Sequence, residues 1–213
     1  VPVCPEMGIG LGAPRETIHL MGTLHEDAVR AVGTRSADLD VTGRLEQYGS
    51  DKAAELGELC GYVFMGRSPS CGLANIKVYH ANGNPVGRST RGIYAREFTQ
   101  RHPLLPVEEE GRLRDPQLCD NFVTRVYAWQ RWRALEASGL THARLQDFHA
   151  RHKYLLMAHK PAAYQHLGRL VALSHQRPVA DAANDYIHDF MATLATVASH
   201  KSHTNVLQHL AGY

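Results

Sequence analysis

Cysteine is scarce in this chain, and long apolar runs are missing from it. Only four of the 213 residues are cysteine, which argues against the disulfide framework of a small secreted domain. Their uneven placement favours a reducing cytoplasm in which the thiols are free or bind a metal. No apolar run approaches the roughly 18 residues that a membrane-spanning helix needs, so we expect no membrane partner.

A strong excess of charge of one sign is also missing. The 23 Lys and Arg residues face 21 Asp and Glu residues, which leaves a formal net charge of +2. A charge this small does not by itself indicate nucleic-acid binding. With 44% hydrophobic residues, a chain of this length can bury one core or two small ones.

The two halves of the chain differ in pattern. Over residues 1–116, glycine and proline are frequent and short apolar segments alternate with helical ones. This predicts an α/β domain with a parallel, Rossmann-like sheet. Over residues 117–213 the apolar spacing is helical, which predicts an all-α domain.

Individual elements of the first half can be predicted from apolar segments and breaker residues. The expected strands are residues 1–3, 17–21, 61–65, 76–79 and 104–107. We expect helices over 36–60, with Leu45 and Tyr48 on the inner face, and over 91–100. Asn82-Gly83 is expected to form a turn.

In the second half we expect four helices. The first begins near Asn121 and ends at Gly139, and Thr141 caps the second. Pro161 opens the third, and the fourth covers 179–199. The expected inner stripe of the second helix is Leu145, Phe148, Tyr154, Leu155 and Met157.

Two cysteines lie in turn-like segments, Cys4-Pro5-Glu6 and Ser68-Pro69-Ser70-Cys71-Gly72. Proline fixes the backbone and glycine permits close approach, so both segments are suited to present a thiolate to iron or zinc. The alternative is that both are small buried hydrophobes, which the polar flanks fit less well. We expect Cys4 and Cys71 to follow parallel strands at one sheet edge and to share one metal centre.

The polar neighbours of these cysteines have two interpretations each. Glu6 is either a general base or substrate-orienting carboxylate, or a surface or helix-capping residue. Ser68 and Ser70 either hydrogen-bond a substrate or a cluster sulfur, or close the Ser-Pro turn. The run 108–110 of three glutamates is expected to be a solvated loop.

The other cysteines and the histidines are weaker candidates. Cys60 is expected to pack in the core, and Cys119 to carry no chemistry. His149 and His152, like His200 and His203, have helical spacing that suits zinc. No carboxylate or cysteine completes either set, so a weakly basic solvated face is the preferred interpretation.

Several longer segments resemble the 2-thiouracil desulfurase (TudS-like) family fused to a YbgA-like helical domain. The desulfurase resemblance rests on Val3-Cys4-Pro5-Glu6, Gly12-Ala13-Pro14-Arg15-Glu16, Cys60-Gly61-Tyr62-Val63-Phe64, Ser68-Pro69-Ser70-Cys71-Gly72 and Lys77-Val78-Tyr79. The fused form is indicated by segments 91–96 and 105–113. The YbgA-like part rests on segments 152–159, 167–172 and 203–207.

The resemblance implies an iron–sulfur enzyme. The family holds a 4Fe-4S cluster with three cysteines, and one open iron binds the sulfur of a thiolated pyrimidine, whose C–S bond is cleaved without net redox change. Cys4 and Cys71 match two of the ligand motifs. Glu6 and Ser70 match positions that line the substrate pocket. The small-molecule partner implied is 2-thiouracil or a related thionucleobase.

The chain departs from the family at both ends. The family's first ligand lies in an N-terminal Cys-Leu-Leu-Gly-like segment, and we expect this segment and the end of the helical domain to be missing here. Two thiolates hold a cubane poorly, so we expect residues 1–213 alone to be inactive.

The helical domain has several open roles. It could cover the active site, recruit a thiolated tRNA or other nucleic acid, or form a homo-oligomer. The competing interpretation of the whole chain is a non-enzymatic nucleic-acid- or protein-binding module with structural cysteines.

Overall fold

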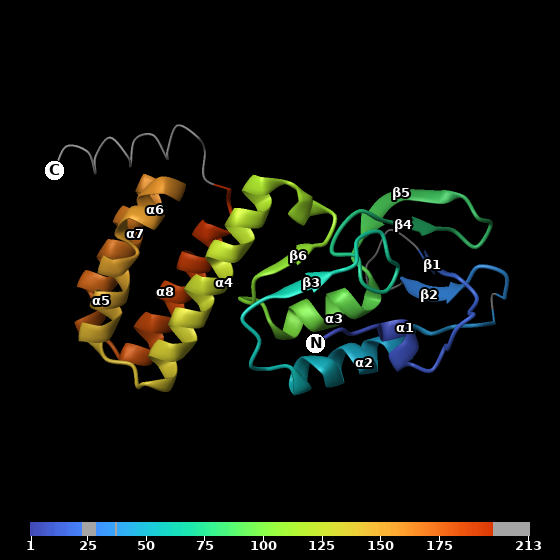
Figure 1. Cartoon of the computed structure of the whole chain (residues 1–213), viewed down its shortest axis with the longest axis horizontal. Helices are drawn as coiled ribbons and strands as arrows, with labels where there is room; N and C mark the ends of the chain where they lie inside the picture. The colour runs from blue at the N-terminus through green and yellow to red at the C-terminus, as the bar shows by residue number, and fades with distance from the viewer. Residues whose placement is uncertain (23–28, 37, 198–213) are drawn as a thin grey trace. The chain divides into compact units, whose positions relative to one another are not determined.

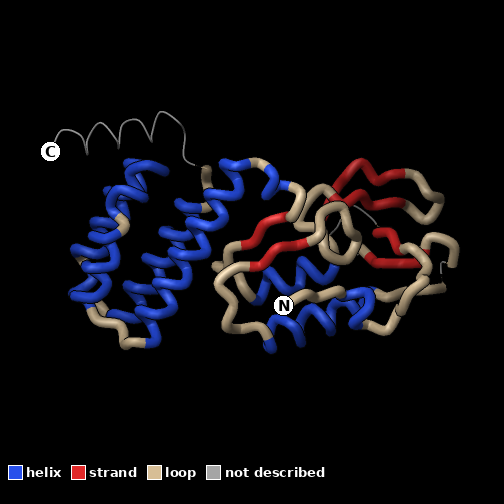
Figure 2. Tube along the Cα trace, in the orientation of Figure 1, coloured by secondary structure: helices blue, strands red, loops and turns tan. Residues whose placement is uncertain are grey.

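The computed structural model describes residues 1–22, 29–36 and 38–197. The chain folds into two compact units, Val1–Arg114 and Asp115–Tyr213. The first contains strands and helices, whereas the described part of the second contains helices and loops alone (Figure 2). The expected fold class, an α/β domain followed by a helical domain, is confirmed. Among the described residues, no helix combines the length and apolarity required to cross a membrane.

The first unit has two sheets (Figure 1). The strands are β1 (Ile18–Met21), β2 (Arg30–Gly33), β3 (Tyr62–Phe64), β4 (Ile76–Tyr79), β5 (Pro85–Thr90) and β6 (Val107–Glu109). Four of them form a sheet in the order β2-β1-β4-β5, and β3 pairs with β6. The pairs β1–β4 and β3–β6 are parallel, whereas β1–β2 and β4–β5 are antiparallel.

The parallel pairs use strands that the apolar pattern predicts. The strands expected over 17–21, 61–65 and 76–79 are present as β1, β3 and β4. The antiparallel neighbours β2 and β5 were not expected, and they make the sheet mixed. The predicted turn at Asn82-Gly83 connects β4 to β5, and Gly83 has a φ of +81° that suits glycine.

Two strand predictions need correction. Residues 1–3 form no strand, and Val1 is fully exposed; no described strand pairs with this segment. The strand expected over 104–107 begins only at Val107, because Leu105 closes a turn onto the His102 carbonyl at 3.2 Å. The Pro106 carbonyl still accepts from the Tyr62 N–H at 2.9 Å, which starts the β3–β6 pairing.

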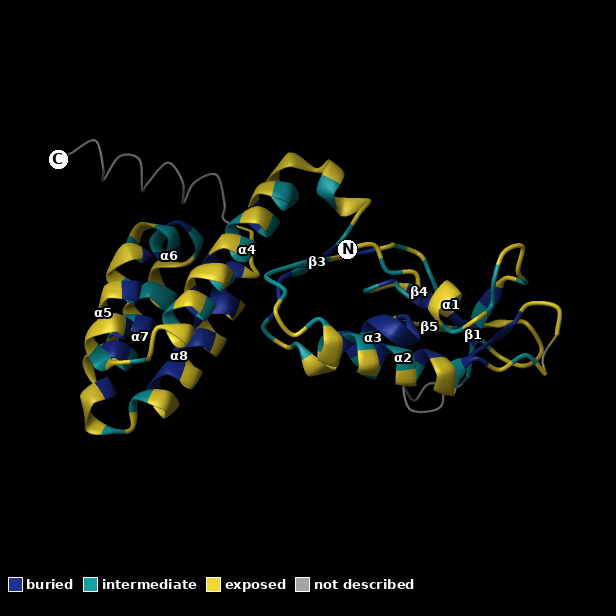
Figure 3. Cartoon of the chain, turned by 60° about the horizontal axis from the view of Figure 1, so that its bottom comes forward, coloured by how far each residue is buried: buried dark blue, intermediate teal, exposed yellow. Residues whose placement is uncertain are grey.

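Three α-helices are described in the first unit: α1 (Pro5–Gly8), α2 (Thr42–Glu55) and α3 (Ile93–Arg101). The helix expected over 36–60 is shorter, since Asp40 accepts from the N–H of Thr42 at 2.9 Å where α2 begins. Gly49 lets α2 approach α3, because a Cβ there would lie 2.9 Å from the Cβ of Glu97. Leu45 is fully buried as predicted, and α3 is buried along much of its length (Figure 3).

The second unit consists of five described α-helices: α4 (Pro116–Ala137), α5 (His142–Arg151), α6 (Lys153–His159), α7 (Pro161–Ala172) and α8 (Val179–Leu194). The first helix starts earlier than expected, because the Asp115 carboxylate caps it by accepting from the N–H groups of Gln117 and Leu118. The predicted cap is present, with the Thr141 hydroxyl 3.2 Å from the Arg144 N–H. The fourth predicted helix, expected to reach 199, ends earlier, because α8 stops at Leu194 and residues 195–197 are not helical; 198–199 lie outside the described residues.

The prediction of which residues line the inner face of the second helix is only partly correct. Leu145 and Phe148 are buried as predicted, but Tyr154 is exposed. The helix is interrupted at His152, where α5 ends and α6 begins. The interruption shifts the helical phase, and Leu156 and Ala158 are buried in α6 instead.

Candidate functional site

A tight turn after β3 carries Ser68, Ser70 and Cys71. The Ser68 hydroxyl oxygen accepts from the backbone N–H of Cys71 at 3.1 Å and from that of Ser70 at 3.3 Å. The Ser68 carbonyl accepts from the N–H of Gly72 at 2.8 Å. A serine side chain that binds the backbone in this way fixes the turn, so Ser68 has the turn-closing role that was one of its two interpretations.

The carbonyls of this turn bind the start of α3. The Pro69 and Ser70 carbonyls accept from the N–H groups of Ile93 and Ala95, both at 3.1 Å. These are N–H groups that lack partners inside a helix. Gly92 makes the approach possible, because a Cβ there would lie 2.4 Å from the Ser70 carbonyl oxygen. The turn that carries Cys71 is thereby fastened to a buried helix.

The second segment of the site is Cys4 and the short helix α1 that follows it. Cys4 precedes the helix and is exposed, and its carbonyl accepts from the Gly8 N–H at 2.9 Å. A Cβ on Gly8 would lie 2.3 Å from the Tyr48 ring, so α1 packs closely on α2. The expectation that Cys4 follows a parallel strand is wrong, because residues 1–3 are not a strand.

The side chains of the two segments meet at Glu6. The Ser70 hydroxyl donates to Glu6 Oε1 at 2.8 Å, and Arg15 Nε donates to Glu6 Oε2 at 2.7 Å. The Ser70 hydroxyl lies 2.9 Å from the Ser68 hydroxyl and 3.8 Å from the Cys71 sulfur. Ser70 is 1% exposed. A continuous polar line therefore runs from Arg15 through Glu6 and Ser70 to Cys71.

Cys4 and Cys71 interact electrostatically with each other and with the charged groups around them. Burial raises the pKa of the Cys71 thiol to about 11, and the charges of Glu6 and Cys4 add to this rise, whereas hydrogen bonds from Ser70 and Ser68 oppose it. Hydrogen bonding to Glu6 raises the pKa of Arg15, and Cys4 again contributes. Direct contacts thus link four of the five predicted site residues, Glu6, Ser68, Ser70 and Cys71, and the fifth, Cys4, interacts electrostatically with Cys71.

Arg15 and a tyrosine pair belong to the site but had no predicted role. The hydroxyls of Tyr62 and Tyr94 lie 3.1 Å apart. Burial raises the pKa of both tyrosines, and the charge of Cys71 adds to both rises. The residues occur in motifs that carry the family resemblance, but those motifs alone do not indicate which side chains face Cys71.

Of the three glutamates at 108–110, Glu108 and Glu109 lie in β6 and are not part of a solvated loop, whereas Glu110 follows the strand and is exposed. Glu109 Oε1 accepts from the Leu73 N–H at 2.8 Å, and Glu110 Oε2 accepts from the Gly66 N–H at 2.6 Å. Glu108 is 8% exposed and accepts from Arg112 at 2.7 Å. The Glu109 and Glu110 carboxylates thus bind the chain on either side of the turn that carries Cys71.

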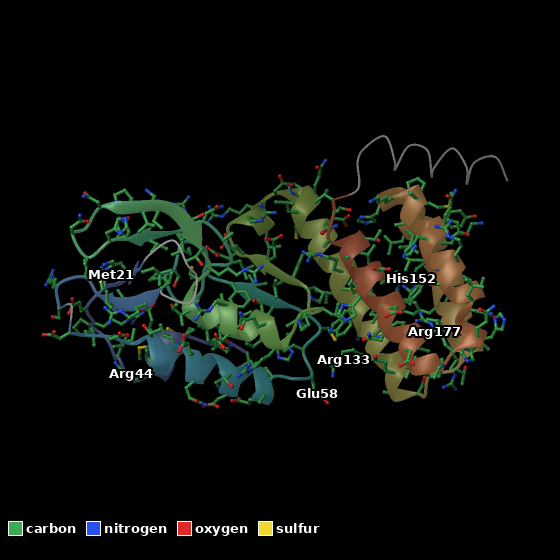
Figure 4. The ribbon with its side chains drawn as sticks, turned by 180° about the vertical axis from the view of Figure 1, so that it is seen from behind. Met21, Arg44, Glu58, Arg133, His152 and Arg177 are labelled. Atoms are coloured by element: carbon green, nitrogen blue, oxygen red, sulfur yellow. The ribbon has the colours of Figure 1, made fainter. Side chains whose placement is uncertain are left out.

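His149, on α5, and His152, which follows α5, both make protein contacts. His149 stacks on Tyr164 and lies 3.2 Å from the Tyr186 hydroxyl. His152 is buried, and its Nδ1 lies 2.7 Å from the Phe148 carbonyl (Figure 4). The pair His200 and His203 lies outside the described residues.

The thiols suit a soft metal, but they are few. All four cysteines of the chain lie in the described part, and all four are free. Cys4 and Cys71 offer the thiolate donors that iron–sulfur clusters use. Within residues 1–22, 29–36 and 38–197, no group of three or more Cys, His, Asp or Glu could hold a metal ion. Cys4 and Cys71 therefore offer two thiolate donors, and the described residues alone do not complete a metal site.

Comparisons with known proteins match both parts of the chain. The 2-thiouracil desulfurase family model matches residues 1–110, and a model described as a protein of unknown function (DUF1722) matches residues 153–213. The uncharacterized protein YbgA of Escherichia coli (strain K12) is 36% identical over 95 residues, which cover 44% of this chain. The match spans 56% of the length of that relative. No solved structure matches the chain.

Proposed function

Because this chain belongs to the 2-thiouracil desulfurase family, we propose that its first unit removes sulfur from a thiolated pyrimidine, 2-thiouracil or a related thionucleobase. The observation that carries the proposal is the line of contacts from Glu6 through Ser70 to Cys71, with Cys4 close by. It combines a carboxylate that can accept a proton with thiols that can hold a metal, the two kinds of group that the proposed non-redox C–S cleavage uses.

In this proposal Cys4 and Cys71 are two of the ligands of a 4Fe-4S cluster. When bound, the cluster supplies a thiophilic Lewis acid at an iron without a protein ligand. The Cys71 turn is fastened to α3 and the Cys4 carbonyl accepts from the Gly8 N–H of α1, so the backbone is fixed at both cysteines.

The proton chemistry is assigned to Glu6. Its Oε1 can accept a proton from an attacking water, or it can hold a ring N–H of the pyrimidine. The Ser70 hydroxyl donates to the same oxygen, and Ser68 lies within reach of that hydroxyl. In the overall reaction a C–O bond to the water oxygen forms, the C–S bond breaks, and sulfur leaves as hydrogen sulfide without net oxidation or reduction.

The second unit is assigned to the YbgA-like domain, following the similarity to YbgA and the match over 153–213. We propose that it serves the desulfurase either by recruiting a thiolated tRNA or other nucleic acid, or by forming a homo-oligomer. The free state of all four cysteines supports a reducing cytoplasm as the location.

The test is desulfuration of 2-thiouracil by anaerobically purified full-length protein. The release of sulfide is measured over time. Glu6→Gln removes the proton acceptor and should lower kcat roughly 10²–10⁴-fold, which is the usual contribution of one acid–base group. The control is Glu58→Gln, since Glu58 is exposed (Figure 4). Unchanged turnover of Glu6→Gln would assign Glu6 to structure, and no sulfide release by the unaltered protein would contradict the proposed function.

A further inference from the structure

Arg15 is held at three points by the segment that begins with Cys4. Its Nε donates to Glu6 Oε2 at 2.7 Å, and its Nη1 contacts the Gly12 carbonyl at 3.2 Å and the Met7 sulfur at 3.7 Å. The guanidinium is planar and its donors have a fixed geometry. Three contacts from one rigid group fix the position and orientation of the guanidinium, and therefore of the carboxylate that it binds.

Each of the two Glu6 carboxylate oxygens accepts a hydrogen bond from a different residue. Oε2 accepts from Arg15 and Oε1 accepts from Ser70. The Glu6 side chain is 17% exposed and that of Arg15 29%, so water has limited access to the pair. Without Arg15, Glu6 could rotate about its side-chain bonds and leave the Ser70 hydroxyl.

From these contacts we infer that Arg15 is a positioning residue for Glu6: it binds Oε2 and so keeps Oε1 directed at Ser70 and the reacting atoms. The expected effect of Arg15 on turnover rests on the proposed function. Its expected effect on the contact between Glu6 and Ser70 does not. Arg15 acts through Glu6 and has no proton-transfer role of its own.

The chain offers a matched control for a purely structural role. Arg44, on α2, donates from Nη1 to the Ile9 carbonyl at 3.1 Å (Figure 4). It fastens the same segment of chain to the domain, but its described contact is with the backbone and does not involve Glu6. Arg44→Gln therefore removes an anchoring arginine without removing the partner of the carboxylate.

The first measurement needs no activity. Arg15 and Ser70 have only Glu6 in common among their described hydrogen bonds. In thermal unfolding of the cluster-free full-length protein, the shifts caused by Arg15→Gln and Ser70→Ala should therefore fail to add, because each variant already frees the same carboxylate. Arg44→Gln and Ser70→Ala should add. Additive shifts for the Arg15 pair would overturn the inference.

The second measurement is kinetic. Arg15→Gln should lower kcat about 10- to 100-fold through misplacement of the carboxylate, with KM changed by less than about threefold, and Arg44→Gln should leave both nearly unchanged. When Glu6→Gln is already present, Arg15→Gln should cause no further loss. An equal loss with and without Glu6→Gln would show an independent role for Arg15 and overturn the inference. Absence of activity in the unaltered protein would contradict the proposed function alone, since the unfolding measurement still decides the role of Arg15.

Discussion

The hydroxyl of Ser70 donates to the carboxylate of Glu6 at 2.8 Å, although the two residues are 64 positions apart in the chain. Ser70 is held by the turn on α3, and Glu6 lies in the first turn of α1 beyond Cys4. This one contact links the two cysteine-bearing segments. It also places the Glu6 carboxylate beside the Cys71 turn.

Removal of the Ser70 hydroxyl should weaken catalysis without removing a metal ligand. Ser70→Ala leaves Glu6 Oε1 without its hydrogen-bond donor. Loss of the free energy of a hydrogen bond to a charged group should lower kcat about 10- to 100-fold. The measurement is steady-state desulfuration together with the absorption spectrum of the protein. Ser89→Ala, at an exposed serine on β5, should change neither. A normal kcat for Ser70→Ala would contradict the role assigned to this contact.

The packing of the Cys71 turn against the start of α3 should depend on Gly92. Gly92→Ala places a Cβ 2.4 Å from the Ser70 carbonyl oxygen, which is backbone and cannot move aside easily. We expect a loss of about 1–3 kcal/mol in the free energy of unfolding, typical of overpacking, measured by circular dichroism in denaturant. Gly111→Ala is the control, since nothing lies within 4 Å of its added Cβ. Equal stability of both variants would show that the turn can shift without cost.

Alkylation of Cys71 in the cluster-free protein should be slow near neutral pH. The thiolate is the reactive form, and burial raises the pKa of this thiol to about 11. Its rate with iodoacetamide should rise about tenfold for each pH unit until the pH approaches that pKa. Mass spectrometry of the peptide that contains Cys71 gives this rate directly. A rate that levels off near pH 8 would contradict the buried environment described for Cys71.

The helical unit should lose stability in mild acid. Burial lowers the pKa of His149 and of His152 below the ordinary value of 6.5, and the His152 Nε2 is buried without a hydrogen-bond partner. Below pH 6.5 the unfolded chain therefore binds protons that the folded unit does not bind. The stability is fully present above 6.5 and is lost as the pH falls from there through the lower pKa values of the folded state.

Tryptophan fluorescence isolates this effect, because both tryptophans of the chain, Trp129 and Trp132, lie on α4. Denaturant unfolding should be followed from about pH 8 to pH 5. His152→Leu should reduce the dependence on pH, whereas replacement of the exposed His175 by Gln should keep it. A stability independent of pH in the unaltered protein would contradict the neutral state of the buried histidines.

The parts of the fold that sequence reasoning predicts are those that depend on local chemistry. The Ser68–Gly72 turn follows from its own serine and proline residues, and Thr141 caps a helix by contacting a residue three positions away. The strand β2 has no such signal, because its pairing with β1 connects Gly33 with Ile18. Residues 1–3 are apolar enough for a strand, yet no described strand pairs with them.

The same distinction holds for the site. The cysteine motifs indicate Cys4, Glu6, Ser70 and Cys71, because proline and glycine beside them restrict the backbone. Arg15 cannot be identified in this way, since its partner Glu6 is set by the path of the chain between them. The burial of Glu108 depends on the β3–β6 pairing, which a run of three charges does not indicate.

The central claim is that Cys4 and Cys71, and neither of the other two cysteines, hold the cluster of a desulfurase. The most direct measurement is iron and acid-labile sulfide per chain, with the iron–sulfur absorption band, in anaerobically purified full-length protein carrying one Cys→Ser change at a time. Cys4→Ser and Cys71→Ser should lose iron and absorption, because each removes a thiolate ligand. Cys60→Ser and Cys119→Ser should retain both. Full iron content after the loss of Cys4 or Cys71 would contradict the account.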